Sequence, residues 1–310
     1  MEAAPRAAIL EDMSLTDPEL SAAPAARLPG DLRLGAVALT VSDLDRSVAF
    51  YQDAIGLQVH RREDATVAMG AGRDDLVVLV EEPGARRAGR HAGLYHVALL
   101  HPSRLELARA TMRLAATRTP IEGASDHGVS EAIYLPDPDG NGIELYADRP
   151  SGQWPTPGPG ERLRMITEPL DLDGLLTEVA GEEPHRHADP GLVVGHLHLH
   201  VGDLGRGLAF YRDLVGFEPM VLFPNAAFVS AGGYHHHLGF NTWRGEGVPA
   251  PPPRTVGLRH WTVVLPSREA VAEVRARLEA GGVAVEAGED GALVARDPWG
   301  LALALVAEGA

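Results

Sequence analysis

The sequence contains no cysteine among its 310 residues. Disulfides and thiolate metal sites are therefore excluded, and any metal must be bound by His, Asp or Glu. Long apolar runs are also missing, so nothing in the sequence predicts a membrane span. Positive charge is scarce, since 27 Lys and Arg face 43 Asp and Glu, a formal net charge of −16. Such a balance repels phosphate backbones, and we expect neither a nucleic acid nor a membrane as a partner.

What is present is typical of a globular protein with two domains. The chain is 45% hydrophobic and 23% charged, and its length allows two separate cores. The first 31 residues are rich in Ala and Pro and lack a basic segment followed by an apolar one. We therefore predict a disordered tail, not a signal peptide, and a cytoplasmic location.

An internal repeat organises the rest of the chain. Residues 35–57 and 195–217 share one pattern: a short alternating strand, a capping aspartate, an amphipathic helix and a terminal glycine. The capping aspartates are Asp43 and Asp203, and the terminal glycines are Gly56 and Gly216. A second pair of repeats, 93–116 and 257–280, also predicts a strand followed by a helix, and each continues through an Asp-Pro turn into a final strand.

The predicted fold is α+β, with four βαβββ modules paired into two open half-barrel domains. The segments are a tail (1–31), module 1 (32–90), module 2 (91–150), a connecting segment (151–191), module 3 (192–250) and module 4 (251–310). The connecting segment of about 40 residues could span on the order of 100 Å, so chain order does not dictate which modules pair. Within it, "DLDGLLTEVA" predicts a short helix.

Histidines gather in the stretch "GHLHLHVGDL", which starts module 3. In a strand, His196, His198 and His200 lie on one face. The equivalent first-strand position holds Ala36 in module 1, His96 in module 2, His196 in module 3 and His260 in module 4. The final strands of modules 2 and 4 place Glu144 opposite Ala304.

Only one pairing of neighbouring modules assembles a metal site. Modules 1 and 2 lack one histidine, and modules 3 and 4 lack a carboxylate. Modules 2 and 3 together supply His96, His196 and Glu144, the two-histidine, one-carboxylate set of non-haem Fe(II) oxygenases. We therefore predict that modules 2 and 3 form the active pair, and that modules 1 and 4 form a metal-free domain.

The remaining histidines receive simpler interpretations. His198 and His200 are too far along the strand to join His196 on one metal, so we expect them to line the pocket. His260 is interpreted as structural, because under this pairing Ala304 stands where module 2 has Glu144. In "YHHHLGF", strand alternation predicts His235 and His237 on one face and His236 on the other. Packed or surface roles are expected for His60, His91, His101, His185 and His187.

These motifs resemble the vicinal-oxygen-chelate superfamily, and within it the type I extradiol dioxygenases, nearest to the hydroquinone-type ring-cleaving enzymes of Gram-positive bacteria. The stretch "DHGVSEAIYLPDPDGNGIELYADRP" (126–150) is similar to that family's signature. The resemblance implies that Glu144 is the metal carboxylate, and that Tyr134 and His127 hydrogen-bond the substrate. The strand of His196 and the strand of His96 resemble those supplying the metal histidines.

The same resemblance implies that His236 is the catalytic acid/base, that the metal is Fe(II) with Mn(II) also acceptable, and that the partners are a small aromatic diol and O2. One departure is the order of the motifs: here the Glu-bearing module precedes the first-His module. Asn241, Trp243 and Phe223 are further candidates for the pocket. Alternative functions are a glyoxalase-type isomerase or lyase, and a metal-free antibiotic-binding protein of the same fold. The sequence leaves the diol and the oligomeric state open.

Overall fold

The computed structural model describes residues 22–288 and 291–309, and it confirms the α+β class and the repeated βαβββ pattern. Module 1 contains β1 (Arg33–Val41), α1 (Leu44–Phe50), η1 (Tyr51–Ile55), β2 (Gln58–Glu63), β3 (Thr66–Gly70) and β4 (Val77–Glu81). Module 2 contains β5 (Gly93–His101), α2 (Arg104–Ala116), β6 (Gly123–Asp126), β7 (Ser130–Pro136) and β8 (Gly142–Asp148).

The second half of the chain repeats this order. Module 3 contains β10 (Val193–His200), α4 (Leu204–Leu208), η3 (Ala209–Val215), β11 (Glu218–Phe223), β12 (Ala226–Ser230) and β13 (Leu238–Asn241). Module 4 contains β14 (Gly257–Leu265), α5 (Arg268–Ala280), β15 (Val285–Ala287), β16 (Leu293–Arg296) and β17 (Ala302–Ala307). Between the halves lie η2 (Ser151–Gln153), β9 (Glu168–Pro169) and α3 (Leu172–Thr177), the last confirming the short helix predicted there.

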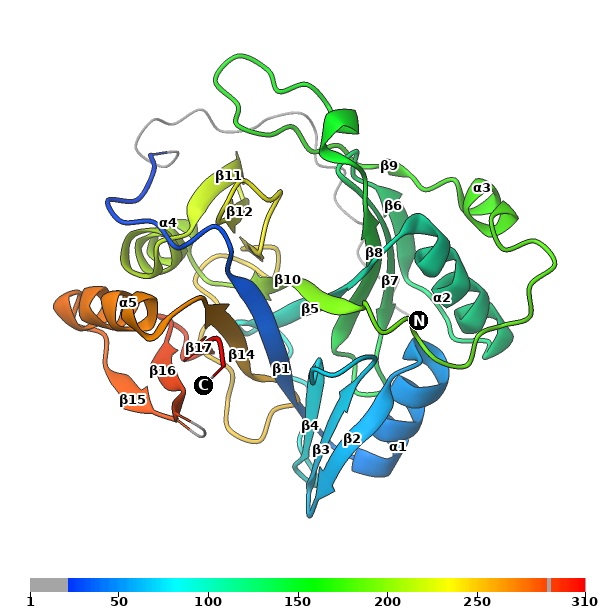
Figure 1. The fold of residues 1–310 in the computed structure, drawn as a ribbon. Helices are drawn as coiled ribbons and strands as arrows, with labels where there is room; N and C mark the ends of the chain where they lie inside the picture. The colour runs from blue at the N-terminus through cyan, green and yellow to red at the C-terminus, as the bar shows by residue number, and fades with distance from the viewer. Residues whose placement is uncertain (1–21, 289–290, 310) are drawn as a thin grey trace.

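One sheet pairs the first and last modules of the chain, and the other pairs the two middle modules (Figure 1). Modules 1 and 4 form an eight-stranded sheet in the order β15-β16-β17-β14-β1-β4-β3-β2. Modules 2 and 3, with β9, form a nine-stranded sheet in the order β11-β12-β13-β10-β5-β8-β7-β6-β9. In each sheet the first strands of the two modules pair antiparallel, β1 with β14 and β10 with β5.

The helix boundaries follow from local chemistry. The side chains of Asp43 and Asp203 each accept the backbone N–H three residues later, which confirms the predicted N-caps. Gly56 and Gly216 end the helical segments with φ values of 85° and 107°, a region that glycine adopts without steric cost.

The second halves of these two helices differ from the prediction, because η1 and η3 are π-helical. Their wider turns leave carbonyl groups at the helix ends to be satisfied by other groups. Arg113 of module 2 donates to the carbonyl of Ile55 at 2.6 Å, and Arg277 of module 4 donates to that of Val215 at 2.7 Å. These arginines therefore tie modules that follow one another in the chain, although the sheets pair them differently.

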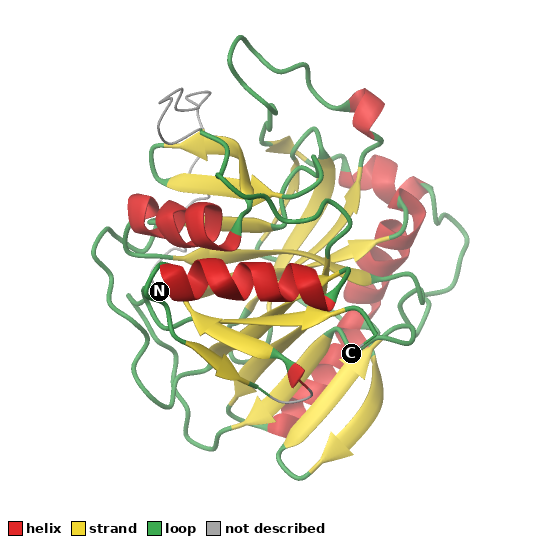
Figure 2. Cartoon of the chain, turned by 60° about the vertical axis from the view of Figure 1, so that its left-hand side comes forward, coloured by secondary structure: helices red, strands yellow, loops and turns green. Residues whose placement is uncertain are grey.

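Alternate residues of a strand point to opposite faces of the sheet, so one face packs in the core and the other carries the site. On β5, Val97 and Leu99 belong to the main apolar cluster together with Leu107 of α2. His96 and Ala98 occupy the alternate positions and point to the opposite face of the sheet. Figure 2 shows the helices along the outside of the sheets, so this opposite face is the one free to form a site.

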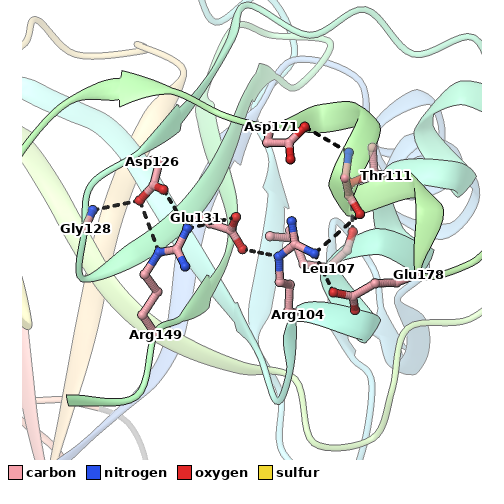
Figure 3. A network of polar contacts seen from close by, with 10 residues as sticks. Arg104, Leu107, Thr111, Asp126, Gly128, Glu131, Arg149, Asp171 and Glu178 are labelled. Atoms are coloured by element: carbon pink, nitrogen blue, oxygen red, sulfur yellow. Dashed lines mark hydrogen bonds and ion pairs between the residues drawn. The ribbon is translucent and has the colours of Figure 1, made fainter. Parts of the chain in front are cut away.

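Polar side chains fasten the connecting segment and the turn after β6 to the nine-stranded sheet (Figure 3). Buried Glu131 forms ion pairs with Arg104 at 2.6 Å and with Arg149 at 3.1 Å. Arg149 also binds Asp126, and Arg104 also binds Glu178 beyond α3. This network fixes the β6–β7 turn that begins at Asp126.

Two predictions at the level of the whole chain can be compared with the fold. Residues 1–21 of the predicted tail lie outside the described residues, whereas residues 22–31 run along module 3, where the Leu28 N–H donates to the Gly216 carbonyl at 2.9 Å. Among the described residues, none of the helices has the length and apolar character needed to traverse a bilayer.

Candidate metal centre and the residues around it

Three adjacent strands of the nine-stranded sheet bring His96, Glu144 and His196 together. Ala98 of β5 pairs with Glu144 of β8 on one side and with His196 of β10 on the other. Paired positions on neighbouring strands share a face, so both side chains flank Ala98, and His96 lies two residues before it on the same face. The buried methyl group of Ala98 leaves room for the three larger side chains.

The three side chains present one ligand atom each, and these atoms all lie within 4.8 Å of one another. Nε2 of His96 lies 3.0 Å and Nε2 of His196 lies 3.1 Å from the same carboxylate oxygen, Oε2 of Glu144. All three are buried, and Glu144 is only 2% exposed. His96 Nε2 is buried and has no hydrogen-bond partner among the described residues.

This donor set fits a divalent metal. A buried imidazole nitrogen without a hydrogen bond costs free energy unless another group compensates, and a metal ion between the three atoms would do so. Burial raises the pKa of the Glu144 carboxyl, but the adjacent rings of His196 and His96 outweigh burial and hold that pKa well below its usual value. Burial lowers the pKa of His196 to about 4, although Glu144 opposes the shift. An ionised Glu144 beside the neutral ring of His196 suits metal binding.

The eight-stranded sheet does not repeat this arrangement. His260 of β14 pairs with Ala38 on one side and Ala302 on the other. The position equivalent to Ala98 is Thr262, whose partner on β17 is Ala304 in place of a glutamate. Within the described ranges, the group formed by His96, Glu144 and His196 is the one set of metal-type side chains that meets at ligand distance.

His198 and His200 are held by Asn241, not directed at the three ligand atoms. The amide of Asn241 donates to Nε2 of His198 at 2.8 Å, and its oxygen accepts from Nδ1 of His200 at 2.8 Å. Burial lowers the pKa of His198 well below its usual value and that of His200 to about 3. Both rings contact Tyr95, which is 37% exposed and lies against Trp243.

His127 and Tyr134 form a hydrogen-bonded pair beside the carboxylate. Tyr134 of β7 pairs with Glu144 of β8, and its ring centroid lies 5.6 Å from that of His96. His127 donates from Nδ1 to the Ile166 carbonyl at 3.0 Å, so its Nε2 accepts from the Tyr134 hydroxyl at 2.8 Å. Burial, with the charge of Glu144, raises the pKa of Tyr134 well above its usual value.

The histidine tract before β13 departs from the prediction. Residues 231–237 form turns and bends and β13 begins only at Leu238, so strand alternation does not apply to His235, His236 and His237. His235 and His236 instead turn toward each other, with their Nδ1 atoms 2.8 Å apart. The ring of His236 lies 4.0 Å from that of His196, which brings it beside the three ligand atoms.

An apolar surface lies next to these imidazoles. We call it the apolar wall, and it includes Phe223, Phe228, Leu163 and Met165. Phe228 of β12 contacts the ring of His198 at 5.4 Å, that of His236 at 5.0 Å and that of Phe223 at 6.0 Å. Leu163 and Met165 of the connecting segment belong to the same apolar cluster. Of these residues, the sequence pointed to Phe223 but not to Phe228, Leu163 or Met165. For Leu163 and Met165 the available signal was apolar residues within a Pro/Gly-rich stretch.

Comparisons with known proteins find relatives in sequence and in fold. Catechol-2,3-dioxygenase of Bacillus subtilis (strain 168) is 42% identical over 273 residues, which are 86% of this chain and 94% of that protein. A solved structure from Bacillus subtilis subsp. subtilis str. 168 is similar with a TM-score of 0.62 at 13% identity, covering 92% of this chain and 87% of that one. Glyoxalase I from Zea mays is similar with a TM-score of 0.55 at 17% identity, covering 89% and 92%. Likenesses at such low identity show the fold.

The family comparison covers most of the chain. Residues 33–145 and 193–305 both match the family described as Glyoxalase/Bleomycin resistance protein/Dioxygenase superfamily. Each matched range holds two consecutive modules, whereas each sheet combines modules from both ranges. The chain therefore belongs to the Glyoxalase/Bleomycin resistance protein/Dioxygenase superfamily.

Proposed function

We propose that the protein is an extradiol ring-cleaving dioxygenase that acts with O2 and a non-haem Fe(II) on catechol or a related dihydroxylated aromatic. The main support for this proposal is that the buried side chains of His96, Glu144 and His196 lie within ligand distance of one another. Further support is the 42% identity to a relative named Catechol-2,3-dioxygenase over most of both chains.

In this proposal His96, His196 and Glu144 would hold the metal, a ligand set that suits non-haem Fe(II). When bound, Fe(II) supplies a template for the diol and O2 together with the electron transfer that O2 chemistry requires. The same ligand set accepts Mn(II). The domain assignment follows: segments 91–150 and 192–250 carry the site, and segments 32–90 and 251–310 form a metal-free domain.

The side chains around the three ligands have separate roles in proton transfer and substrate binding. His236 removes a proton from the diol and returns it later, which suits an imidazole near neutral pH. Tyr134, whose hydroxyl is held by His127 at 2.8 Å, orients a substrate oxygen through hydrogen bonding. Phe228 and Phe223 provide an apolar surface for the aromatic ring and exclude water from it.

A direct test is oxygen uptake by anaerobically prepared protein after loading with Fe(II). We expect uptake with catechol, a substituted catechol or hydroquinone, accompanied by a ring-opened product with the semialdehyde-type absorbance of extradiol cleavage. The His236→Ala variant should keep its iron and lose most of this activity. Iron-loaded protein that consumes no O2 with any of these diols would exclude the dioxygenase. Isomerisation of a glutathione hemithioacetal by the same protein would favour the glyoxalase-type alternative.

A further inference from the structure

Behind His236, a chain of hydrogen bonds leads away from the candidate metal centre. Nδ1 of His236 lies 2.8 Å from Nδ1 of His235, and Nε2 of His235 lies 2.8 Å from Oδ1 of Asp148. Asp148 ends β8, four residues after Glu144, so one strand supplies both the metal carboxylate and the end of this chain. His235 is fully buried, and its ring packs against Tyr234 at 4.1 Å.

With an ionised Asp148 and a neutral His235, the order of these contacts assigns one proton to each ring. An ionised Asp148 can only accept, so Nε2 of His235 is the donor. In a neutral His235 ring, Nδ1 then has a lone pair and accepts, which makes Nδ1 of His236 the donor. The neutral His236 ring has one proton, and its Nε2 is left as an acceptor on the side away from His235.

We propose that Asp148 and His235 are positioning residues that fix the tautomer of His236, so that His236 presents an unprotonated Nε2 to the substrate. The inference rests on the proposed function, in which His236 moves a proton of the diol. In that step one O–H bond of the diol breaks and one N–H bond forms at Nε2, and no electrons are exchanged with the relay. Nδ1 of His236 keeps its proton and its bond to His235.

This arrangement has the logic of the serine-protease triad, in which a buried aspartate holds a histidine in the correct tautomer. Here a second imidazole stands between the carboxylate and the base. Asp148 also accepts from the Tyr234 hydroxyl at 3.3 Å, and Tyr234 meets Tyr146 at 2.8 Å. The Tyr234 hydroxyl and Nε2 of His235 therefore both bind Oδ1 of Asp148, and Tyr146 holds the Tyr234 hydroxyl.

The first test needs no variant and no metal. Ring ¹⁵N NMR of the metal-free protein with labelled histidine reports which nitrogen of each ring is protonated. We expect the proton on Nε2 of His235 and on Nδ1 of His236 above neutral pH. A His236 ring that carries its proton on Nε2 would overturn the proposal, whether or not the protein cleaves a diol.

The second test is the Asp148→Asn variant of the Fe(II)-loaded enzyme. We expect kcat to fall on the order of 100-fold with KM changed less than about 3-fold and iron content unchanged. The matched control is Asp75→Asn, since Asp75 also binds a histidine, His60, at 2.8 Å and is similarly exposed, 27% against 29% for Asp148. Asp75 lies at the other sheet, so its variant should keep the wild-type kcat.

The outcomes separate the two proposals. Equal kcat in the Asp148→Asn and Asp75→Asn variants would overturn the relay while leaving the dioxygenase intact. A wild-type protein that consumes no O2 with any diol would overturn the function, and the NMR result would then decide the tautomers independently. If Asp148→Asn does not fold, the wild-type NMR result still supports or refutes the relay.

Discussion

The buried histidine at the end of β5, His101, allows a quantitative prediction of how the free energy of unfolding changes at acidic pH. It is 2% exposed, and neither ring nitrogen has a hydrogen-bond partner among the described residues. Burial, with the nearby charge of Arg113, lowers its pKa from 6.5 to about 3. Between pH 6.5 and pH 3, His101 is therefore protonated in the unfolded chain but neutral in the folded protein. The free energy of unfolding is highest above pH 6.5 and decreases as the pH falls toward 3.

The size of the effect follows from the two pKa values. One pH unit corresponds to about 1.4 kcal/mol for a single group, so lowering the pH from 7 to 5 costs about 2 kcal/mol through His101 alone. The His101→Leu variant removes this proton linkage while filling a similar volume. The loss of unfolding free energy between pH 7 and pH 5 should therefore be about 2 kcal/mol smaller in His101→Leu than in the wild type.

Urea unfolding of the metal-free protein at both pH values measures this difference without a contribution from metal binding. The His187→Leu variant replaces an exposed histidine and should keep the wild-type pH dependence. Burial lowers the pKa of His200 to about 3 and that of His237 to about 4, so acid destabilisation remains in every variant but is weaker without His101. Equal pH dependence in the wild type and His101→Leu would refute the reasoning.

Three other predictions concern neighbouring features. Phe228→Ala should raise KM for the diol about 10-fold with less change in kcat, because the wall loses its central ring; an unchanged KM in oxygen uptake would exclude Phe228 from the binding surface. Arg113→Met should lower the unfolding free energy by about 2–4 kcal/mol, since the carbonyls of Ala54 and Ile55 lose their donor; a loss below about 0.5 kcal/mol in urea unfolding would refute this. His198→Gln should retain iron by metal analysis, because Nε2 of His198 is engaged by Asn241; iron loss would make His198 a ligand.

Much of the fold could be predicted because the modules repeat. Comparison of the four modules by strand position singled out His96, His196 and Glu144. The structure brings the ligand atoms of these three residues within 4.8 Å of one another. The capping residues Asp43 and Asp203 were equally readable, since a cap depends on residues within one helical turn.

What the sequence did not reveal depends on contacts between distant segments. The π-helical turns arise where Arg113 and Arg277 reach across from other modules. The His235–His236 contact is formed in a turn, where no periodicity governs side-chain direction. Asp148 is 87 positions from His235 in sequence, so no spacing rule joins them. Leu163 and Met165 reach the wall only because the connecting segment runs across the sheet.

The measurement that tests the central claim most directly is iron bound per chain in the Glu144→Ala and His260→Ala variants, loaded anaerobically with Fe(II). The account predicts one iron per chain in the wild type and in His260→Ala, and none retained in Glu144→Ala with its fold intact by circular dichroism. Iron kept by Glu144→Ala and lost by His260→Ala would contradict it, because the metal would then belong to the sheet of modules 1 and 4.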